Sequence, residues 1–384
     1  MLRHHYEPEH EQFRAAFRRF LEQQVLPHSA RFREQGLIDR EIYTKAGEGG
    51  FLCYYVPEEY GGLGIADLRY DQLMYEEITQ VHETSLMIGA LNRNAPPYIV
   101  KYGSEEQKRH YLPKLASGEM ICGIAMTEPD AGSDIGGFKT RAERRGDGTW
   151  VLNGQKTYIS FGIVADMFVV AAKTDPANPR QLGLFIVERG MEGFRSGRKL
   201  DKLGYRAQDT AELFFDNVEL TPLHVIGDPA RGFDYMRGGL AEERIASAVQ
   251  SLPFAVEALR LAVDFTTQRK AFGQTVADFQ NTKFKLAEMR TEILAAQALA
   301  DHCVRLFNAG ELDPATASAC KLKCSEVQAM AVDQSLQLHG SAGFMWEYPI
   351  CQLYADSRIS RIFAGTSEVM KIVISKDMLQ QKPR

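Results

Sequence analysis

The sequence predicts an α+β protein built from a helical domain, a β domain and a second helical domain. Apolar residues recur at helical spacing in residues 1–120 and again in residues 231–384. Residues 121–230 instead carry short runs of aromatic and β-branched residues between turn signals, a pattern typical of strands. A chain of 384 residues is also too long for one simple core. We therefore expect three domains with these boundaries.

The first helical domain begins with an amphipathic pattern. Five apolar residues follow a spacing of about 3.6 residues: Phe13, Phe17, Phe20, Leu21 and Val25. Pro27 is expected to end that helix, and the pair Pro96-Pro97 to kink or end another. A glycine-rich turn near Gly61 interrupts the helical pattern, and Ser104 is a good N-cap for a further helix.

The middle domain is expected to be an antiparallel barrel or sandwich of roughly seven or eight strands. Its apolar runs include Trp150-Val151-Leu152, Met167 to Ala171, Leu184 to Val187 and Ala211 to Phe215. Turn signals separate these runs at Gly146-Asp147-Gly148 and elsewhere. Because Asn153-Gly154 lies between two strand-like runs, we expect a hairpin turn there.

The second helical domain is expected to be a four-helix bundle. Its long apolar stripes are typical of packed helices and comprise Val256, Leu259, Val263, Phe284, Met289, Ile293 and Ala296. Pro253 lies inside the first of these helices and is expected to bend or split it.

Composition excludes several classes of protein. The net charge of −5 and the lack of a long Lys/Arg run argue against binding nucleic acid or an anionic membrane. The sequence contains no stretch of about 18 apolar residues, so it predicts no transmembrane helix. The six cysteines contain no Cys-x-x-Cys, which indicates reduced thiols in an intracellular protein. Cys320 and Cys324 are four positions apart, but no nearby His completes a metal site, so we expect no metal.

One loop is the most informative stretch of the chain, and it reads Ala125-Met126-Thr127-Glu128-Pro129-Asp130-Ala131-Gly132-Ser133-Asp134. The small residues Ala131 and Gly132 let the backbone approach a ligand, and free amides in such a turn bind acceptor atoms. A capped turn at a domain edge is the alternative interpretation, because Gly/Ser/Asp clusters are common in loops.

Two motifs in this order resemble the signatures of the acyl-CoA dehydrogenase flavoprotein family. The first is the loop just described. The second comprises Gln337-Leu338-His339-Gly340-Ser341-Ala342-Gly343-Phe344, then Glu347-Tyr348-Pro349 and Gly365-Thr366-Ser367-Glu368. The resemblance extends to the turns at Tyr60 to Gly64 and Arg269 to Gly273, so it covers nearly the whole chain. It implies two helical domains on either side of a β domain, and FAD as cofactor.

The chemistry implied is α,β-dehydrogenation of an acyl-CoA thioester to the trans-2-enoyl-CoA, as in fatty-acid β-oxidation. A base removes the α-proton, and flavin N5 takes the β-hydride, since no side chain accepts a hydride. The base should be a carboxylate whose pKa is raised by burial.

The position of the base places the chain near the long-chain and isovaleryl branch of the family. Many members carry the base just before Gly-Thr, where this chain has Ala364. In that branch a Glu on a long helix, immediately before an Arg, replaces it. The resemblance therefore implies Glu243 as the base, with Glu242 pointing about 100° away on the helix. The alternative is an ordinary acidic helix start that complements the helix dipole.

The remaining site residues are implied by resemblance alone. Ser133, Arg244, Ala364 and Gly365 are expected to contact the substrate: Ser133 near the pantetheine, Arg244 at the CoA end, and the Ala364 N–H on the thioester carbonyl. Arg269, Phe272 and the 337–341 segment are expected to reach the FAD of a neighbouring subunit. The alternative interpretation is that Tyr158 and Phe272 are core aromatics and that Arg269 is a solvated charge at a helix end. The expected FAD-binding residues are Ile124, Ala125, Met126, Thr127, Gly132, Ser133, Tyr158, Ile159, Ser160, Arg269, Phe272, Gln337, Leu338, His339, Gly340, Ser341, Thr366 and Glu368.

The resemblance also implies partners. We expect an electron-transfer flavoprotein as electron acceptor and a homotetramer, a dimer of dimers, in the bacterial cytoplasm or, for a mature eukaryotic chain, the mitochondrial matrix. Three alternatives stay open. They are a flavin oxidase or monooxygenase on the same fold, a dehydrogenase of carrier-protein-bound acyl groups, and a non-catalytic flavin- or acyl-binding protein.

Overall fold

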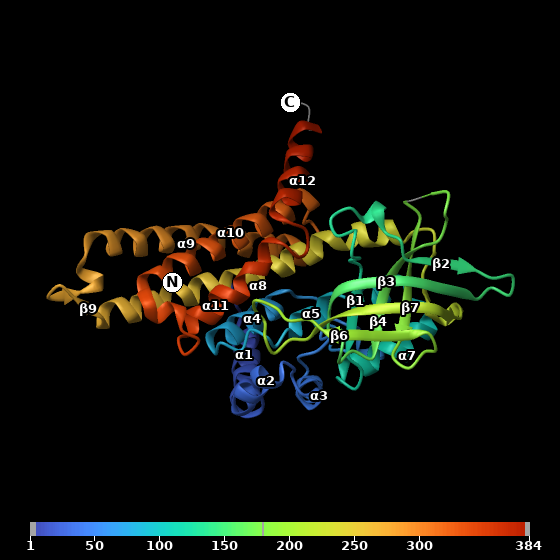
Figure 1. The fold of residues 1–384 in the computed structure, drawn as a ribbon, viewed down its shortest axis with the longest axis horizontal. Coiled ribbons are helices and arrows are strands. Elements are labelled where there is room, and N and C mark those ends of the chain that lie inside the picture. Colours follow the sequence, from blue (N-terminus) through green and yellow to red (C-terminus); the bar gives the residue numbers. More distant parts are fainter. Residues whose placement is uncertain (1–4, 179, 381–384) are drawn as a thin grey trace.

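The computed structural model describes residues 5–178 and 180–380, and its elements follow the helical, β, helical order (Figure 1). The N-terminal helices lie below the long C-terminal helices in that view, and the sheet lies at one end of the molecule. The N-terminal helices are α1 (Pro8–Phe20), α2 (Ser29–Gln35), α3 (Arg40–Glu48), α4 (Arg69–Gln80), α5 (Ile88–Arg93), α6 (Pro96–Tyr102) and α7 (Glu105–Ala116).

Prolines lie close to two helix boundaries in this domain. After α1 the chain forms a π-helical turn and then a 3₁₀ turn that contains Pro27, and α2 begins directly afterwards. The pair Pro96-Pro97 occupies the first turn of α6, where a missing N–H costs nothing. As predicted, Ser104 caps α7, with its hydroxyl accepting from the Gln107 N–H at 3.2 Å. Helix α6 also contacts the first helix of the C-terminal domain.

The middle domain holds eight strands in one sheet, of order β6-β7-β3-β2-β4-β5-β8, with β1 paired to β4. Most pairs are antiparallel, but β1 pairs with β4, and Arg141 with Lys173, in parallel. The β domain is therefore present as expected but is a mixed sheet, because β1 enters from the helical domain and joins β4 in the same direction. The strands are β1 (Cys122–Ala125), β2 (Arg141–Arg144), β3 (Trp150–Ser160), β4 (Met167–Lys173), β5 (Leu182–Glu188), β6 (Phe194–Lys199), β7 (Thr210–Leu220) and β8 (Val225–Ile226).

The hairpin predicted at Asn153-Gly154 is wrong. Strand β3 runs through both residues, and its register against β7 shifts between Leu152 and Gly154. Gly154 has φ +146°, and a Cβ there would lie 2.5 Å from Oγ1 of Thr140, so this glycine forms a bulge with close packing. The turn between β2 and β3 instead contains Gly148, at φ +91°.

The C-terminal domain is organised around α8, which runs from the sheet to the far end of the molecule (Figure 1). Pro253 does not split this helix of 37 residues, because α4, α9 and α10 pack along it and hold the helical path. The elements are α8 (Gly232–Gln268), β9 (Lys270–Ala271), β10 (Gln274–Thr275), α9 (Gln280–Asn308), α10 (Pro314–His339), α11 (Pro349–Ser357) and α12 (Ser367–Gln380).

The predicted bundle stripe is buried in part. Met289, Ile293 and Ala296 lie in the core formed by α8, α9 and α10. Val256 and Phe284, in contrast, are 47% and 56% exposed. Part of the apolar face of the bundle is therefore uncovered within a single chain.

The described residues contain no helix long and apolar enough to cross a membrane. Across residues 5–178 and 180–380, no three His, Cys, Asp or Glu side chains gather as a metal site. The six cysteines are free thiols, and all but Cys351 are buried.

Candidate functional site

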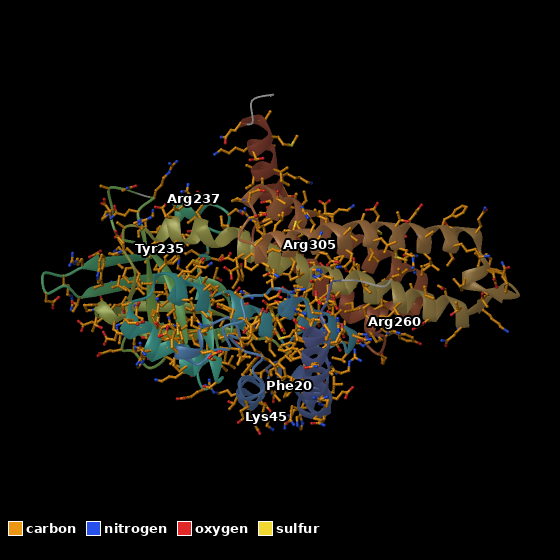
Figure 2. All side chains as sticks on the ribbon, turned by 180° about the vertical axis from the view of Figure 1, so that it is seen from behind. Phe20, Lys45, Tyr235, Arg237, Arg260 and Arg305 are labelled. Atoms are coloured by element: carbon orange, nitrogen blue, oxygen red, sulfur yellow. The ribbon has the colours of Figure 1, made fainter. Side chains whose placement is uncertain are left out.

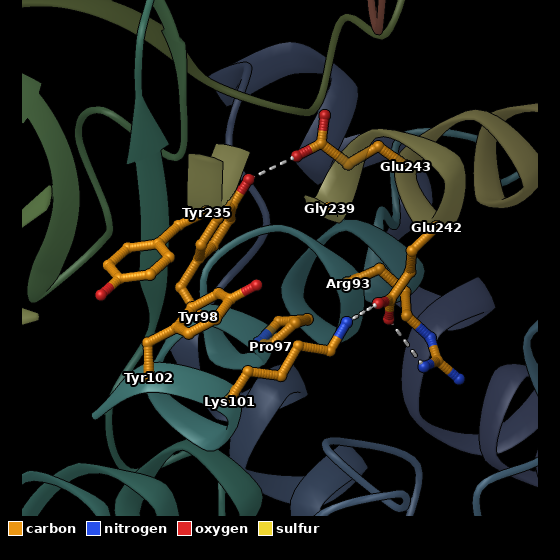
Figure 3. Close-up of a pocket in the computed structure, with 9 residues that line it drawn as sticks. All are labelled: Arg93, Pro97, Tyr98, Lys101, Tyr102, Tyr235, Gly239, Glu242 and Glu243. Carbon is orange, nitrogen blue, oxygen red and sulfur yellow. Dashed lines mark hydrogen bonds and ion pairs between the residues drawn. The ribbon is translucent and has the colours of Figure 1, made fainter. Parts of the chain in front are cut away.

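A small cavity lies where α6 meets the first turns of α8 (Figure 3). Its volume is about 10 Å³, room for about one water molecule, so it does not hold an acyl chain in this conformation. The Tyr102 and Tyr235 rings stack at a centroid distance of 4.0 Å in its wall. The lining residues are Arg93, Pro97, Tyr98, Lys101, Tyr102, Tyr235, Gly239, Glu242 and Glu243.

Two adjacent carboxylates of α8 enter this region with different partners. Glu242 is ion-paired, with one oxygen 2.5 Å from Lys101 Nζ and the other 3.2 Å from Arg93 Nη1. Glu243 has no cationic partner within ion-pair distance among the described residues, and its Oε1 accepts a hydrogen bond from the Tyr98 hydroxyl at 2.9 Å. Figure 3 shows the two side chains diverging from the helix. Of these two carboxylates, Glu242 alone is held in ion pairs, whereas Glu243 is held by a neutral hydroxyl.

Burial raises the pKa of Glu243 to about 7. The Tyr98 hydrogen bond opposes this effect, because it stabilises the charged carboxylate and lowers the pKa. A carboxylate that exchanges its proton near neutral pH is suited to act as a general base.

Arg244 is buried beneath the first turn of α10. Its Nη1 donates to Oγ of Ser318 at 3.1 Å, while its Nε has no hydrogen-bond partner among the described residues. The guanidinium lies near Glu243, which raises the pKa of Arg244, although burial lowers that pKa more.

The turn before α12 has an unusual backbone. Ala364 and Gly365 both have left-handed φ values, +50° and +89°. Lys321 reaches this turn from α10, and its Nζ donates to the Gly365 carbonyl oxygen at 2.6 Å. Thr366 caps α12 by accepting from the Val369 N–H at 3.2 Å, and Glu368 lies in the first turn.

The structure brings together the two predicted flavin segments of the β domain. The Thr157 N–H donates to the Thr127 carbonyl at 2.9 Å, which joins the loop 124–133 to the end of β3 that carries Tyr158, Ile159 and Ser160. Tyr158 is 70% exposed and has φ +58°, so it is not a core aromatic. A Cβ on Gly132 would meet nothing within 4 Å.

The other predicted cofactor residues lie at the far end of α8. The His339 ring stacks on Phe265 at a centroid distance of 4.4 Å, which places the segment 337–341 beside Arg269 and the β9–β10 turn. Residues 244 and 265 are 21 positions apart in α8, or about 30 Å at ~1.5 Å per residue. Figure 2 labels Tyr235 near the sheet and Arg260 toward that far end. Within one chain, these residues are separate from Glu243.

Phe272 at the tip of the β9–β10 turn is 97% exposed with φ +51°. It is therefore not a core aromatic of this chain. A large apolar side chain in this position favours contact with another molecule.

Several residues of the site were not predicted from the sequence. Tyr98 and Lys101 share one face of α6 with Tyr102, and their spacing of three and four residues could have indicated a common polar face. Lys156 pairs with Glu128 at 2.8 Å beneath the loop, but its neighbours in β3, Gln155 and Thr157, are polar, so nothing in the local sequence indicated that this lysine is buried. Lys321 likewise carried no signal in an otherwise ordinary helix.

Family models match three successive parts of the chain. They describe the acyl-CoA dehydrogenase N-terminal domain at residues 7–119, the middle domain at 123–218 and the C-terminal domain at 230–379. The chain belongs to the acyl-CoA dehydrogenase family. The family prediction and the three-part fold prediction are thereby confirmed, apart from the mixed pairing in the sheet.

The relatives of this acyl-CoA dehydrogenase agree with the assignment. The mitochondrial long-chain specific acyl-CoA dehydrogenase of Sus scrofa is 40% identical over 99% of this chain and 89% of its own length. The acyl-CoA dehydrogenase of Geobacillus kaustophilus superposes with a TM-score of 0.95 at 42% identity, covering 98% of this chain and 100% of that one. An acyl-CoA dehydrogenase complexed with FAD from Bacillus anthracis has a TM-score of 0.90 at 31% identity, covering 98% and 67%.

This acyl-CoA dehydrogenase is therefore an oxidoreductase of the flavoprotein type, and its reaction is the flavin-dependent dehydrogenation of an acyl-CoA. The residues present fit a flavin: an exposed Tyr158 ring stands beside a loop that a small residue, Gly132, keeps open. The oxidase alternative is not favoured by these relatives.

Proposed function

We propose that Glu243 removes the α-proton of the acyl-CoA thioester. The observation that supports this assignment is the contrast with Glu242, whose charge is neutralised by Lys101 and Arg93. Glu243 forms no ion pair with a described residue, and its pKa of about 7 lets it take a proton at neutral pH. Ala364 occupies the alternative position of the base and cannot serve.

The Ala364 N–H is proposed to polarise the thioester carbonyl. This amide makes no hydrogen bond to any described residue, and it lies in the turn held by Lys321. A preorganised N–H donor stabilises the negative charge that develops on the carbonyl oxygen as the α-proton leaves. Arg244 and Ser133 are proposed to contact the CoA portion.

FAD is proposed as the flavin, and it would supply the acceptor for the β-hydride when bound. Thr127, Ser133, Tyr158 and Ser160 would hold its ring, with the rest of the 124–133 loop and Ile159. Thr366 and Glu368 would contact the same cofactor.

A second copy is proposed to supply Arg269, Phe272 and the segment 337–341 to each cofactor, in a homotetramer. The distance of about 30 Å along α8 and the exposure of Phe272 support this arrangement. A monomeric mass for the fully active enzyme in solution would contradict it.

A fatty or branched acyl-CoA is the proposed substrate, with an electron-transfer flavoprotein as acceptor. The long-chain specific relative supports the long-chain class. The compartment is proposed to be the bacterial cytoplasm or, in a eukaryote, the mitochondrial matrix.

Anaerobic mixing with acyl-CoAs tests this function. The holoenzyme is expected to lose its oxidised-flavin absorbance on mixing with straight or branched acyl-CoAs in the absence of oxygen, and to react slowly when air is admitted. Rapid re-oxidation by air would favour the oxidase alternative. No absorbance loss with any thioester would favour a binding protein.

Removing the Tyr98 hydroxyl is expected to move the pH dependence of the reaction. In Tyr98→Phe, Glu243 loses the hydrogen bond that lowers its pKa, so the pKa rises above its present value of about 7. Because the base acts when deprotonated, kcat/KM increases with pH through this pKa. The midpoint is expected to move upward by about one pH unit, since a hydrogen bond to a charged group contributes ~1.5 kcal/mol.

Tyr102→Phe is the matched control for that measurement. Tyr102 lines the same cavity but donates no hydrogen bond to Glu243. Its kcat/KM profile should keep the wild-type midpoint, and equal shifts in both variants would show that Tyr98 acts through packing alone.

A further inference from the structure

Lys321 is a buried cation without a carboxylate partner. Its side chain is 0% exposed, and no ion pair joins it to an acidic group among the described residues. Burying an ammonium is costly unless it is paired or hydrogen-bonded. Burial, and then repulsion from Arg244, lowers the pKa of Lys321 to about 8, against a weaker attraction from Glu368.

The acceptor that Lys321 does have is a backbone carbonyl in the proposed active-site turn. Its Nζ lies 2.6 Å from the Gly365 oxygen, a short distance for a charge-assisted hydrogen bond. The two residues are 44 positions apart, on α10 and just before α12. The bond therefore ties the turn to the body of the bundle.

That turn needs to be held. Ala364 is a non-glycine residue in the left-handed region, and such a conformation costs about 1 kcal/mol or more. Neither the Ala364 nor the Gly365 N–H donates a hydrogen bond to a described residue. The Lys321 contact restrains the Gly365 carbonyl, and with it the direction of the peptide groups on either side.

We propose that Lys321 is a positioning residue that fixes the 364–365 turn so that the Ala364 N–H is aimed at the thioester carbonyl. This inference rests on the proposed role of that amide. This role explains why an ammonium group is buried here, since Lys321 contacts neither Glu243 nor the cavity beside it.

The test measures the thioester carbonyl itself. The probe is a 3,3-dimethyl acyl-CoA with a ¹³C carbonyl, of a chain length the enzyme turns over, which has no β-hydrogen to lose. Its carbonyl stretching frequency, recorded by difference infrared spectroscopy on holoenzyme, is expected to fall on binding to the wild type. In Lys321→Met that decrease should shrink, and kcat should fall by about 10- to 100-fold with KM nearly unchanged, less than the 10²- to 10³-fold loss of a whole donor.

Two further variants separate positioning from general damage. Lys321→Gln keeps a neutral donor and should give an intermediate frequency, which preserves the test if the Met variant folds poorly. Gln328→Met changes another fully buried polar residue two turns along the same helix, with no hydrogen-bond partner among the described residues, and should leave the band unchanged.

The outcomes separate the role of Lys321 from the proposed role of the Ala364 amide. An unchanged band in both Lys321 variants, or an equal change in Gln328→Met, would overturn the role of Lys321 while the amide's role stands. A wild-type enzyme that leaves the carbonyl frequency unchanged would overturn the amide's role itself.

Discussion

Glu243→Gln is expected to lower turnover by about 10²- to 10⁴-fold, the range typical of a lost general base. The amide has nearly the same shape as the carboxylate and still accepts the Tyr98 hydrogen bond, so the pocket should keep its form. Steady-state turnover and anaerobic single-turnover mixing both report the loss. The flavin content of the variant should equal that of the wild type.

Glu242→Gln is the matched control, one residue away on the same helix. That change leaves Lys101 and Arg93 with less compensation, so it should reduce stability while turnover per folded enzyme changes far less. If Glu243→Gln kept near-native turnover, or if Glu242→Gln lost as much, the assignment of the base would be wrong.

The Glu243→Gln variant should be more stable than the wild type at alkaline pH. The pKa of Glu243 is about 7 in the folded protein and 4.5 ordinarily, so between these values the folded state binds more protons than the unfolded chain. Its contribution to stability therefore falls as pH rises through this window. By pH 8 Glu243→Gln is expected to exceed the wild type by on the order of 3 kcal/mol, and near pH 4 the two should agree. Denaturant unfolding at the two pH values measures this difference.

The sequence was sufficient for the order of the domains because helical and strand periods are local signals, whereas Glu243 was named as the candidate base from the resemblance to the family. The helical and strand periods separate the domains, and two adjacent glutamates on one helix must diverge. Asn153-Gly154 shows the limit of such signals. The dipeptide favours a turn, but β3 pairs with β7 on both sides of it, and long-range pairing decides its conformation.

Contacts between distant segments could not be predicted. Tyr98 and Glu243 are 145 positions apart, and their hydrogen bond depends on how α6 meets α8. The exposed Val256 and Phe284 show the same limit, because periodicity reports an apolar face and not the molecule that covers it.

A buried ion pair between Lys156 and Glu128 lies beneath the loop 124–133. Lys156 is 0% exposed, and its Nζ lies 2.8 Å from both Glu128 Oε1 and the Met126 carbonyl oxygen. Burial raises the pKa of Glu128, but the Lys156 charge and the Lys139 N–H together lower it below its usual value. The pair thus links β3, which carries Tyr158, to the loop 124–133.

Glu128→Gln is expected to destabilise the protein by about 3 kcal/mol, because it leaves Lys156 buried without a counter-charge. The double variant Glu128→Leu/Lys156→Met removes both charges and should recover most of that stability. It still lacks the bond to the Met126 carbonyl, so its flavin-to-protein ratio should stay below that of the wild type. Denaturant unfolding and flavin content measured on the same samples separate the two effects. Wild-type unfolding of Glu128→Gln would show that the pair is not needed for stability, and full flavin retention in the double variant would show that Lys156 does not shape the loop.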